Sequence, residues 1–448
     1  MKNNIFIEKY IYSGYGFSKY NNEIYFVENA CPGDFVEIEE QYEKKNIHFS
    51  KISMIIEPSK HRRKPMCDYF TVCGGCQWLN CDYEEQLNQK TNIVQEQLKR
   101  LSSIEVEVDK TIRSNSQYDY RAKMEFAFST NEEGEIVLGL NQRNSNNIID
   151  IENCPISPKP FDKIKNVVRK LVKEYDVPIY DPKTKKGMLK HLVLRKSFSS
   201  NNVMAIFITH TEFFPRLKDI KAQLVKIFNG INVIHVMNSS DKVTLRGPYK
   251  SLTGEGVLKE EFDGFNFQIP PTSFFQNNYY VTGKMLKYIL EYYKKEKTSN
   301  TSLLDLYCGV GLFGNYFAPL FKQVIGIDYT KLSIKAAKAN SNINNIKNTT
   351  FIAADAKEKI LEFAEKGKKF DYVIVDPPRA GLENKLVGIL SKMVEKSIIY
   401  ISCNPSTLAR DLKQFQDENF KIKSVQPFDM FPNTYHVETV VILERIEI

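Results

Sequence analysis

The sequence predicts a multidomain protein with an N-terminal OB-like β-barrel, a central α+β domain and a C-terminal α/β domain with a Rossmann-like, doubly wound sheet. The expected ranges are residues 1–57, 58–270 and 271–448. A chain of 448 residues can form about two to three domains, each with its own core. Short glycine-punctuated β patterns fill the first range. In the third range, β-branched runs alternate with helical segments, which is typical of a parallel sheet.

Composition places the chain among ordinary globular proteins, with 42% hydrophobic and 26% charged residues. Every apolar run is shorter than the roughly 18 residues that span a bilayer. Residues Met1–Glu8 lack the apolar core and cleavage site of a signal peptide. We therefore expect a cytosolic protein with no membrane partner. The net charge of +8 is compatible with a polyanionic partner but does not require one.

The stretch from Phe370 to Asp411 has the pattern of a parallel βαβ unit. One apolar run ends in the turn 376–381 (DPPRAG), and the next opens into residues 402–405 (SCNP). Both turns are expected side by side at the carboxyl edge of the sheet, where such sheets bind ligands. Cys403 precedes a helix start, so the helix dipole is expected to lower the pKa of its thiol and favour a nucleophilic thiolate. A cysteine that merely packs at the strand end is the alternative.

A glycine-rich loop opens the C-terminal α/β pattern. After a predicted strand at 303–307, the G-x-G-x-x-G spacing of residues 309–314 lets the backbone approach a ligand. The next strand ends in Asp328, 19 residues after Gly309, where an acidic side chain accepts ribose hydroxyls. Asp355 follows the third strand and is placed for an adenine edge. NAD is the rival ligand, but the acidic Asp305 before the loop and the Pro-Pro turn favour S-adenosylmethionine.

Three cysteines fall within ten residues, at Cys67, Cys73 and Cys76, and two glycines between the last two allow backbone amides to approach the sulfurs. This spacing favours a soft metal centre. The spacing alone leaves open an iron–sulfur cluster, a zinc site completed by Cys81 or Cys154, and unligated buried thiols. The basic run 60–64 before these cysteines is compatible with phosphate contacts or with a solvated linker.

Hydrophobic periodicity predicts the remaining elements. A helix is expected over 83–101, with Leu87, Val94, Leu98 and Leu101 on its buried stripe. The other predicted helices are 161–175, 216–228 and 280–294, and the other predicted strands are 23–27, 34–39, 123–128, 191–195, 203–208, 323–327, 350–352, 420–426 and 435–445, the last two as a hairpin-like pair.

Together these motifs resemble the uracil-5 RNA methyltransferase family, in particular its 23S rRNA branch with a TRAM domain and an iron–sulfur cluster. The resemblance covers nearly the whole chain. It implies that the N-terminal barrel is a TRAM domain, an RNA-binding OB-like fold, and that the C-terminal domain is a class I methyltransferase. The segments that carry it are 273–277 (SFFQN), 305–311 (DLYCGVG), 376–379 (DPPR), 402–405 (SCNP), 436–438 (HVE) and the cysteine pattern Cys67, Cys73, Cys76 and Cys154.

The resemblance implies roles for individual residues. Cys403 is the expected nucleophile and Glu438 the expected general base. The residues expected to contact the methyl donor are Gln276, Tyr307, Asp328 and Asp376, and those expected to ligate a 4Fe–4S cluster are Cys67, Cys73, Cys76 and Cys154. Two positions depart from the family. Asp328 stands where the family usually has the longer Glu, and Leu312 stands where some members have a polar residue.

The expected reaction is methylation of C5 of a uridine in 23S rRNA with S-adenosylmethionine. Cys403 would add to C6 of the ring and Glu438 would remove the C5 proton, whereas Arg379 or Asn404 would stabilise the enolate oxygens. Without the resemblance, the preferred interpretation of Glu438 is a charged residue on an exposed strand. The alternatives are the T-loop uridine of tRNA as substrate and a non-catalytic RNA-binding or ribosome-assembly factor. No DNA partner is expected.

Overall fold

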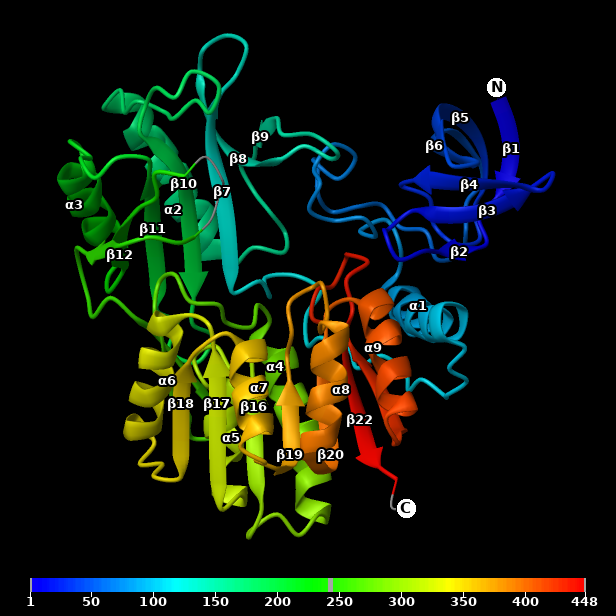
Figure 1. The fold of residues 1–448 in the computed structure, drawn as a ribbon. Helices are drawn as coiled ribbons and strands as arrows, with labels where there is room; N and C mark the ends of the chain where they lie inside the picture. Colours follow the sequence, from blue (N-terminus) through cyan, green and yellow to red (C-terminus); the bar gives the residue numbers. More distant parts are fainter. Residues whose placement is uncertain (1, 241–244, 447–448) are drawn as a thin grey trace. The chain divides into compact units, whose positions relative to one another are not determined.

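The computed structural model describes residues 2–240 and 245–446, which form two compact units (Figure 1). The first comprises Met1–Gln117, Lys287–Ile289 and Lys357–Ile448, and the second comprises Tyr118–Leu286 and Leu290–Ala356. Both units draw on separated stretches of chain, whereas the predicted domain boundaries follow chain order, so the three-domain division stays a prediction. Among the described residues, no helix is both long enough and apolar enough to cross a membrane.

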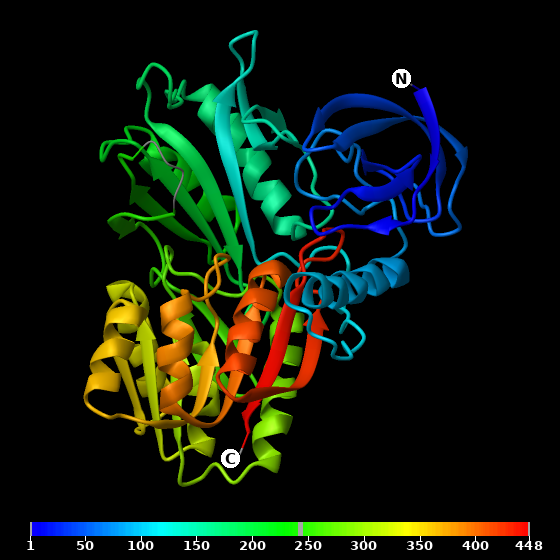
Figure 2. The same cartoon turned by 45° about the vertical axis from the view of Figure 1, so that its right-hand side comes forward.

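A bent sheet occupies the N-terminal part of the first unit (Figure 2). In β5, Val36 and Ile38 point into the core while the glutamates beside them are less buried, which confirms the predicted alternation. The sheet has six strands rather than the five of the predicted barrel, and β4 pairs with β6 in parallel. In the order β1-β5-β6-β4-β3-β2, the strands are β1 (Lys2–Phe6), β5 (Phe35–Lys44), β6 (Ile47–Glu57), β4 (Glu23–Glu28), β3 (Gly16–Tyr20) and β2 (Lys9–Tyr10).

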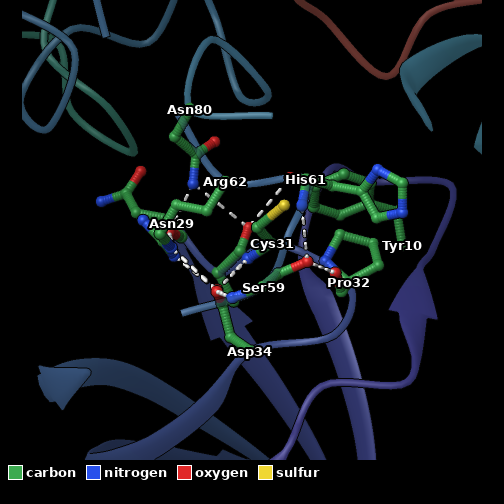
Figure 3. A network of polar contacts seen from close by, with 10 residues as sticks. Tyr10, Asn29, Cys31, Pro32, Asp34, Ser59, His61, Arg62 and Asn80 are labelled. Carbon is green, nitrogen blue, oxygen red and sulfur yellow. Dashed lines mark hydrogen bonds and ion pairs between the residues drawn. The ribbon is translucent and has the colours of Figure 1, made fainter. Parts of the chain in front are cut away.

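The basic run 60–64 is partly built into this unit, as Figure 3 shows. Arg62 donates from Nε to Oδ1 of the fully buried Asp34 at 2.9 Å, and the two side chains form an ion pair. His61 bonds through Nδ1 to Asp82 at 2.6 Å. Arg62 and His61 therefore have structural partners and are not part of a solvated linker, whereas the phosphate-contact interpretation stays a prediction. The other three residues of the run are exposed.

Helix α1 (Tyr83–Ser102) confirms the predicted helix. Asp82 caps it by accepting a hydrogen bond from the Glu85 amide at 2.9 Å. Leu87, Val94 and Leu98 are buried, but Leu101 is 57% exposed, so its place on the buried stripe was predicted wrongly. The helix ends at Ser102, its C-cap Ser103 is in the left-handed region, and Leu98 and Ser102 of the last turn are buried.

The buried face of α1 carries polar residues that the pattern did not reveal. Lys90 and Asp429 form an ion pair at 2.5 Å with both side chains fully buried, and Lys90 also donates to the Phe431 carbonyl at 3.0 Å. The Gln86 side chain accepts a hydrogen bond from the Asn433 main-chain amide at 2.9 Å and donates one to Asn433 Oδ1 at 3.2 Å. These contacts hold residues 429–437 as a loop, so the final strand begins at Glu438 rather than at the predicted residue 435.

The α/β part of the first unit contains the predicted βαβ unit. Strands β19 and β20 are parallel and α8 connects them, which confirms the interpretation of residues 370–411. Strands β21 and β22 form the predicted antiparallel pair, and β22 also pairs with β20, in the order β19-β20-β22-β21. Helix α9 packs against α1 (Figures 1 and 2). The elements are α7 (Ala356–Glu365), β19 (Phe370–Val375), α8 (Asn384–Met393), β20 (Val394–Ser402), α9 (Pro405–Asp417), β21 (Phe420–Phe428) and β22 (Glu438–Arg445).

The second unit contains a mixed sheet of order β13-β12-β11-β10-β7-β8-β9. Helices α2 and α3 share one hydrophobic cluster with this sheet, and the β14–β15 hairpin joins a second cluster. The predicted strands and helices of this region are present. The elements are β7 (Lys123–Thr130), β8 (Ile136–Asn141), β9 (Ile148–Asp150), α2 (Lys159–Glu174), β10 (Leu189–Lys196), β11 (Val203–Thr209), α3 (Leu217–Ile227), β12 (Asn232–Met237), β13 (Tyr249–Ser251), β14 (Leu258–Phe262) and β15 (Phe265–Ile269).

The second unit also contains the glycine loop. Strands β16, β17 and β18 are parallel in the order β18-β17-β16, as the sequence predicted. Asn278 caps α4 by accepting a hydrogen bond from the Val281 amide at 3.3 Å. The elements are α4 (Tyr279–Lys295), β16 (Ser302–Leu306), α5 (Leu312–Phe317), the 3₁₀ turn η1 (Ala318–Leu320), β17 (Gln323–Asp328), α6 (Lys331–Ile343) and β18 (Thr349–Ala353).

The Lys90–Asp429 pair gives a testable prediction. Lys90→Met leaves a buried carboxylate without its counter-ion and should lower the free energy of unfolding by about 3–5 kcal/mol. The double variant Lys90→Met/Asp429→Leu should recover most of this loss, because no buried charge remains. Urea unfolding measures both. Lys413→Ala breaks the exposed Lys413–Asp417 pair and should cost less than about 0.5 kcal/mol. A loss equally small for Lys90→Met would contradict the assignment.

Candidate active site

Cys403 lies between β20 and α9, at the position that the sequence predicted. Asn404 caps the helix by accepting a hydrogen bond from the Ser406 amide at 3.1 Å, and Pro405 is the first helical residue. The apolar residues Leu408, Leu412 and Phe415 of this helix are fully buried. Strand, turn and helix therefore fix the main chain on both sides of the thiol.

The charged groups around Cys403 overturn one prediction. Burial raises the pKa of the Cys403 thiol to about 12, the carboxylates of Glu438 and Asp376 add to this, and Arg379 opposes it. The prediction of a lowered pKa is therefore wrong for the free protein. A helix N-terminus stabilises an anion by roughly 1 kcal/mol. Here that contribution competes with desolvation and with two nearby negative charges.

Glu438 is the first residue of β22, in register with Phe428 of β21. Only 5% of its surface is exposed, so it is not a charged residue on an exposed strand. Burial raises the pKa of the Glu438 carboxyl well above its usual range, Asp376 raises it further, and Arg379 lowers it. A carboxylate with a raised pKa is a stronger base than a solvated one.

The turn 376–381 and the start of α9 lie side by side, as predicted. The Arg379 carbonyl accepts hydrogen bonds from Asn404 Nδ2 at 3.0 Å and from Thr407 Oγ1 at 3.3 Å. Because the Asn404 amide already bonds to Arg379 and to its own helix, the Arg379 guanidinium is the better candidate for stabilising enolate oxygens. Arg379 is exposed, which leaves it accessible to a substrate.

Two aspartates accept hydrogen bonds from the backbone of the glycine loop. Asp305 is fully buried and accepts a hydrogen bond from the Gly314 amide at 2.8 Å, so it supports the loop. Asp328 accepts from the Gly309 amide through Oδ2 at 3.1 Å and from the Thr330 amide through Oδ1 at 2.7 Å. Gly311 has φ +76, and a Cβ there would lie 2.7 Å from the Asn315 side chain. The backbone of the loop is therefore closely determined.

Three other predicted donor contacts follow strands, two in the second unit and one in the first. Tyr307 follows β16 in the left-handed region at φ 62, which is uncommon for a residue with a side chain. Asp355 is exposed and directly precedes α7. Asp376 follows β19 in the first unit and is half-buried. Their roles toward a methyl donor stay predictions.

Gln276 is buried and lines a small pocket together with Lys123, Lys196 and Asn277. The loop that carries it is fixed by Arg195, a residue that the sequence analysis missed. Arg195 is 3% exposed and donates three hydrogen bonds of 2.6–3.2 Å to the carbonyls of residues 270, 271 and 273. The available signal in the sequence was a basic residue at the end of an apolar run that was predicted as a strand.

Comparisons with known proteins identify relatives of this chain. The profile of the tRNA (uracil-5-)-methyltransferase family matches residues 82–446. A protein of Thermotoga maritima described as an uncharacterized RNA methyltransferase is 41% identical over 441 residues, covering 98% of each chain. A similarly described protein of Clostridium tetani is 36% identical over 442 residues, covering 98% of this chain and 95% of the relative.

The chain belongs to the uracil-5 RNA methyltransferase family.

A solved structure supports the membership over nearly the full length. The tRNA (uracil-54, C5)-methyltransferase of Pyrococcus abyssi, solved with S-adenosyl-L-homocysteine, is 28% identical to this chain. It superposes with a TM-score of 0.77 and covers 99% of this chain and 100% of its own. The chain is thus an RNA methyltransferase. This decides against an NAD enzyme and against a non-catalytic RNA-binding factor.

The cysteine segment of this methyltransferase contains close thiol–backbone contacts. The Gly75 amide donates to Cys73 Sγ at 3.4 Å. Burial raises the pKa of the Cys67 thiol, and the neighbouring Cys73 contributes to this. Cys81 instead lies in a hydrophobic cluster with Tyr10, Cys31 and Trp78, so it already has a structural role. Across residues 2–240 and 245–446, no three His, Cys, Asp or Glu side chains meet closely enough to hold a metal ion.

Two further residues of the methyltransferase support the turn 376–381 and were missed in the sequence. Asp411 is fully buried and accepts hydrogen bonds from the Leu382 amide at 2.7 Å and from the Tyr400 hydroxyl at 2.6 Å. Arg410 donates to the carbonyls of Ala380 and Leu382 at 3.0 and 2.8 Å. In the sequence, the only signal was an adjacent pair of charged residues within a helix whose apolar residues repeat at helical spacing.

Alkylation of Cys403 tests the charge environment of the site. Because the thiol pKa is raised to about 12, reaction with iodoacetamide should be slow at pH 7 and should accelerate roughly ten-fold per pH unit up to about pH 11. Glu438→Gln removes one carboxylate that raises this pKa, so alkylation at pH 9 should become several-fold faster. Mass spectrometry of the Cys403 peptide measures the rate. Glu444→Gln, the same change at the other end of β22, should leave it unchanged. No acceleration in Glu438→Gln would contradict the assignment.

Proposed function

We propose that this protein methylates C5 of a uridine in 23S rRNA with S-adenosylmethionine as the methyl donor. The observation that carries the proposal is the meeting of Cys403, Glu438 and Arg379, from three segments remote in sequence, in a chain of this family. The donor is inferred from the glycine loop with Asp328 and from the S-adenosyl-L-homocysteine in the Pyrococcus abyssi structure.

The chemistry requires a nucleophile and a base. C5 of uracil is a poor nucleophile, so Cys403 loses its thiol proton to solvent, adds to C6 as a thiolate and moves electron density to C5. C5 then forms a bond to the methyl group of the donor, which leaves as S-adenosylhomocysteine. Glu438 removes the C5 proton, the C5–C6 double bond re-forms, and the Cys403 thiolate is expelled. Arg379 stabilises the negative oxygen of the enolate.

Five residues are proposed to contact the methyl donor. Asp328 accepts the ribose hydroxyls, Asp355 lies at the adenine edge, and Gln276, Tyr307 and Asp376 contact the remainder. Support comes from the positions of these residues at the ends of parallel strands and in the loop before α4, where open α/β folds bind ligands. The target base is enclosed in RNA structure, so it must be flipped out or lie in a loop to reach Cys403.

The 4Fe–4S cluster and the TRAM domain are part of the proposal. Cys67, Cys73, Cys76 and Cys154 would hold the cluster. The thiolate donor set and the Gly75 amide at Cys73 fit such a centre. Residues 1–57 would form the TRAM domain, and the bent six-stranded sheet supports this.

The T-loop uridine of tRNA is the second candidate substrate. The Pyrococcus abyssi enzyme, which acts on uracil 54 of tRNA, covers this chain from end to end. The full-length architecture is thus compatible with a tRNA substrate, and the cysteines and N-terminal sheet do not by themselves exclude it.

We also propose that the protein acts in the cytosol.

Trapping with 5-fluorouridine tests both reaction and substrate. Fluorine at C5 cannot be removed as a proton, so wild type with donor should form a covalent adduct that survives denaturation, seen by gel shift. Transcripts of 23S rRNA and of tRNA are compared, and the 23S transcript should give the adduct. An adduct with tRNA alone would reassign the substrate, and an adduct with neither would overturn the function.

Two variants separate the steps of the reaction. Cys403→Ser should form no adduct and should lose methylation by at least about 10³-fold, because the nucleophile is absent. Glu438→Gln should accumulate an adduct with ordinary uridine RNA, because the C5 proton stays in place. Ser402→Ala is the control, because it changes a neighbouring side chain and leaves the thiol. Normal turnover in Cys403→Ser would contradict the mechanism.

The cluster is tested by spectroscopy. Anaerobically purified protein should show broad absorbance near 400 nm that is typical of a 4Fe–4S centre, roughly four iron atoms per chain and little zinc. Cys73→Ser should remove it. Cys81→Ser should leave the spectrum unchanged, since Cys81 packs with Cys31. Zinc in place of iron would overturn the cluster assignment without affecting the methyl-transfer mechanism.

A further inference from the structure

A tyrosine from the N-terminal sheet lies beside the predicted nucleophile. Tyr12 follows β2, and its hydroxyl donates a hydrogen bond to the main-chain carbonyl of Cys403 at 3.2 Å. Its ring meets that of Tyr435 edge-on, with centroids 5.5 Å apart. Tyr435 in turn lies 4.2 Å from the ring of His436, in the loop that leads to Glu438. Tyr12 therefore contacts the turn with the nucleophile and the loop with the base.

The turn that carries Tyr12 is tightly held. The Gly14 amide bonds back to the Ile11 carbonyl at 3.0 Å, and Trp78 Nε1 donates to the Gly14 carbonyl at 3.2 Å. Gly14 has φ +90, and a Cβ there would lie 2.7 Å from Gln77 and 3.0 Å from Tyr435. Such packing restricts the motion of the turn, so the Tyr12 side chain has a defined position.

The Tyr12 hydroxyl is a donor under physiological conditions. Burial raises the pKa of this phenol well above its usual range, and the neighbouring Cys403 and Tyr435 add to this while Arg379 opposes it. The proton is therefore retained, and the main-chain carbonyl of Cys403 can only accept. This hydrogen bond restrains the peptide unit next to the sulfur-bearing residue.

We propose that Tyr12 is a positioning residue for methyl transfer. Its hydroxyl fixes the main chain of Cys403 for attack on C6, and its ring supports the loop that places Glu438. The inference rests on the proposed function, in which these two residues do the chemistry. It assigns to the N-terminal sheet a part in the reaction beyond holding RNA. A displacement of about 1 Å at a reacting group can cost up to about 10²-fold in rate.

Hydroxyl removal tests this in the full-length protein. Tyr12→Phe keeps the ring and should slow adduct formation with the 5-fluorouridine transcript about ten-fold. Its affinity for that RNA and for S-adenosylhomocysteine should stay within two-fold of wild type. Tyr175→Phe is the matched control: Tyr175 caps the C-terminus of α2, outside the proposed TRAM domain, and the Arg216 guanidinium lies 5.6 Å from its ring centroid. This variant should behave as wild type.

Ring removal tests the second contact. Tyr12→Leu should also slow release of the adduct formed with ordinary uridine RNA, because the Tyr435–Glu438 loop loses support. Thermal unfolding midpoints check that each variant is folded, and Tyr12→Phe keeps the test valid if Tyr12→Leu is not.

Three outcomes are decisive. A slower kcat in Tyr12→Phe with unchanged KM supports the inference. A wild-type rate in Tyr12→Phe, or a loss confined to KM for RNA, overturns it, and in the latter case Tyr12 is an RNA contact. If wild type itself forms no adduct, the proposed function fails, independently of Tyr12.

Discussion

The buried ion pair between Lys90 and Asp429 is the constraint on which the catalytic part of the molecule depends. Two charges removed from water are tolerated only when they satisfy each other, so the pair allows few other arrangements of α1 and the loop after β21. Gln86 adds neutral hydrogen bonds to the same loop. The loop in turn determines where β22 starts, and hence where Glu438 lies. A carboxyl group at the start of one strand is thus held by a helix more than 300 residues earlier in the chain.

The electrostatic arrangement around Cys403 follows from this packing. A thiol and two carboxyl groups share a region where water is scarce, and Arg379 is the positive group that opposes their effects on one another. The Cys403 thiol therefore keeps its proton in the free protein. A thiol that stays protonated until substrate arrives is less open to oxidation or alkylation, since the thiolate is the reactive form. Reactivity then depends on what enters the site rather than on the helix dipole alone.

The sequence predicted most elements and the neighbourhood of the two functional turns, because the strands there are β-branched runs closed by polar residues. It failed where long-range packing decides. Leu101 has helical spacing like Leu98 and lies within the same helix, yet it is 57% exposed. Lys90, Arg195 and Asp411 look like ordinary charged residues in sequence, and only their partners reveal that they are buried. The pKa of Cys403 was misjudged because Asp376 and Glu438 were not known to be its neighbours. Tyr12 gave no signal at all.

The two amide contacts of Asp328 bear on how the donor would be recognised. Each carboxylate oxygen already accepts one backbone N–H, and each retains a second lone pair. The side chain is therefore pre-organised: its rotamer is selected before a ribose diol arrives, and little conformational entropy remains to be lost on association. A longer Glu at this position would reach further but would have to re-form both anchoring contacts. The shorter side chain is thus matched to the way this particular loop folds back on its strand.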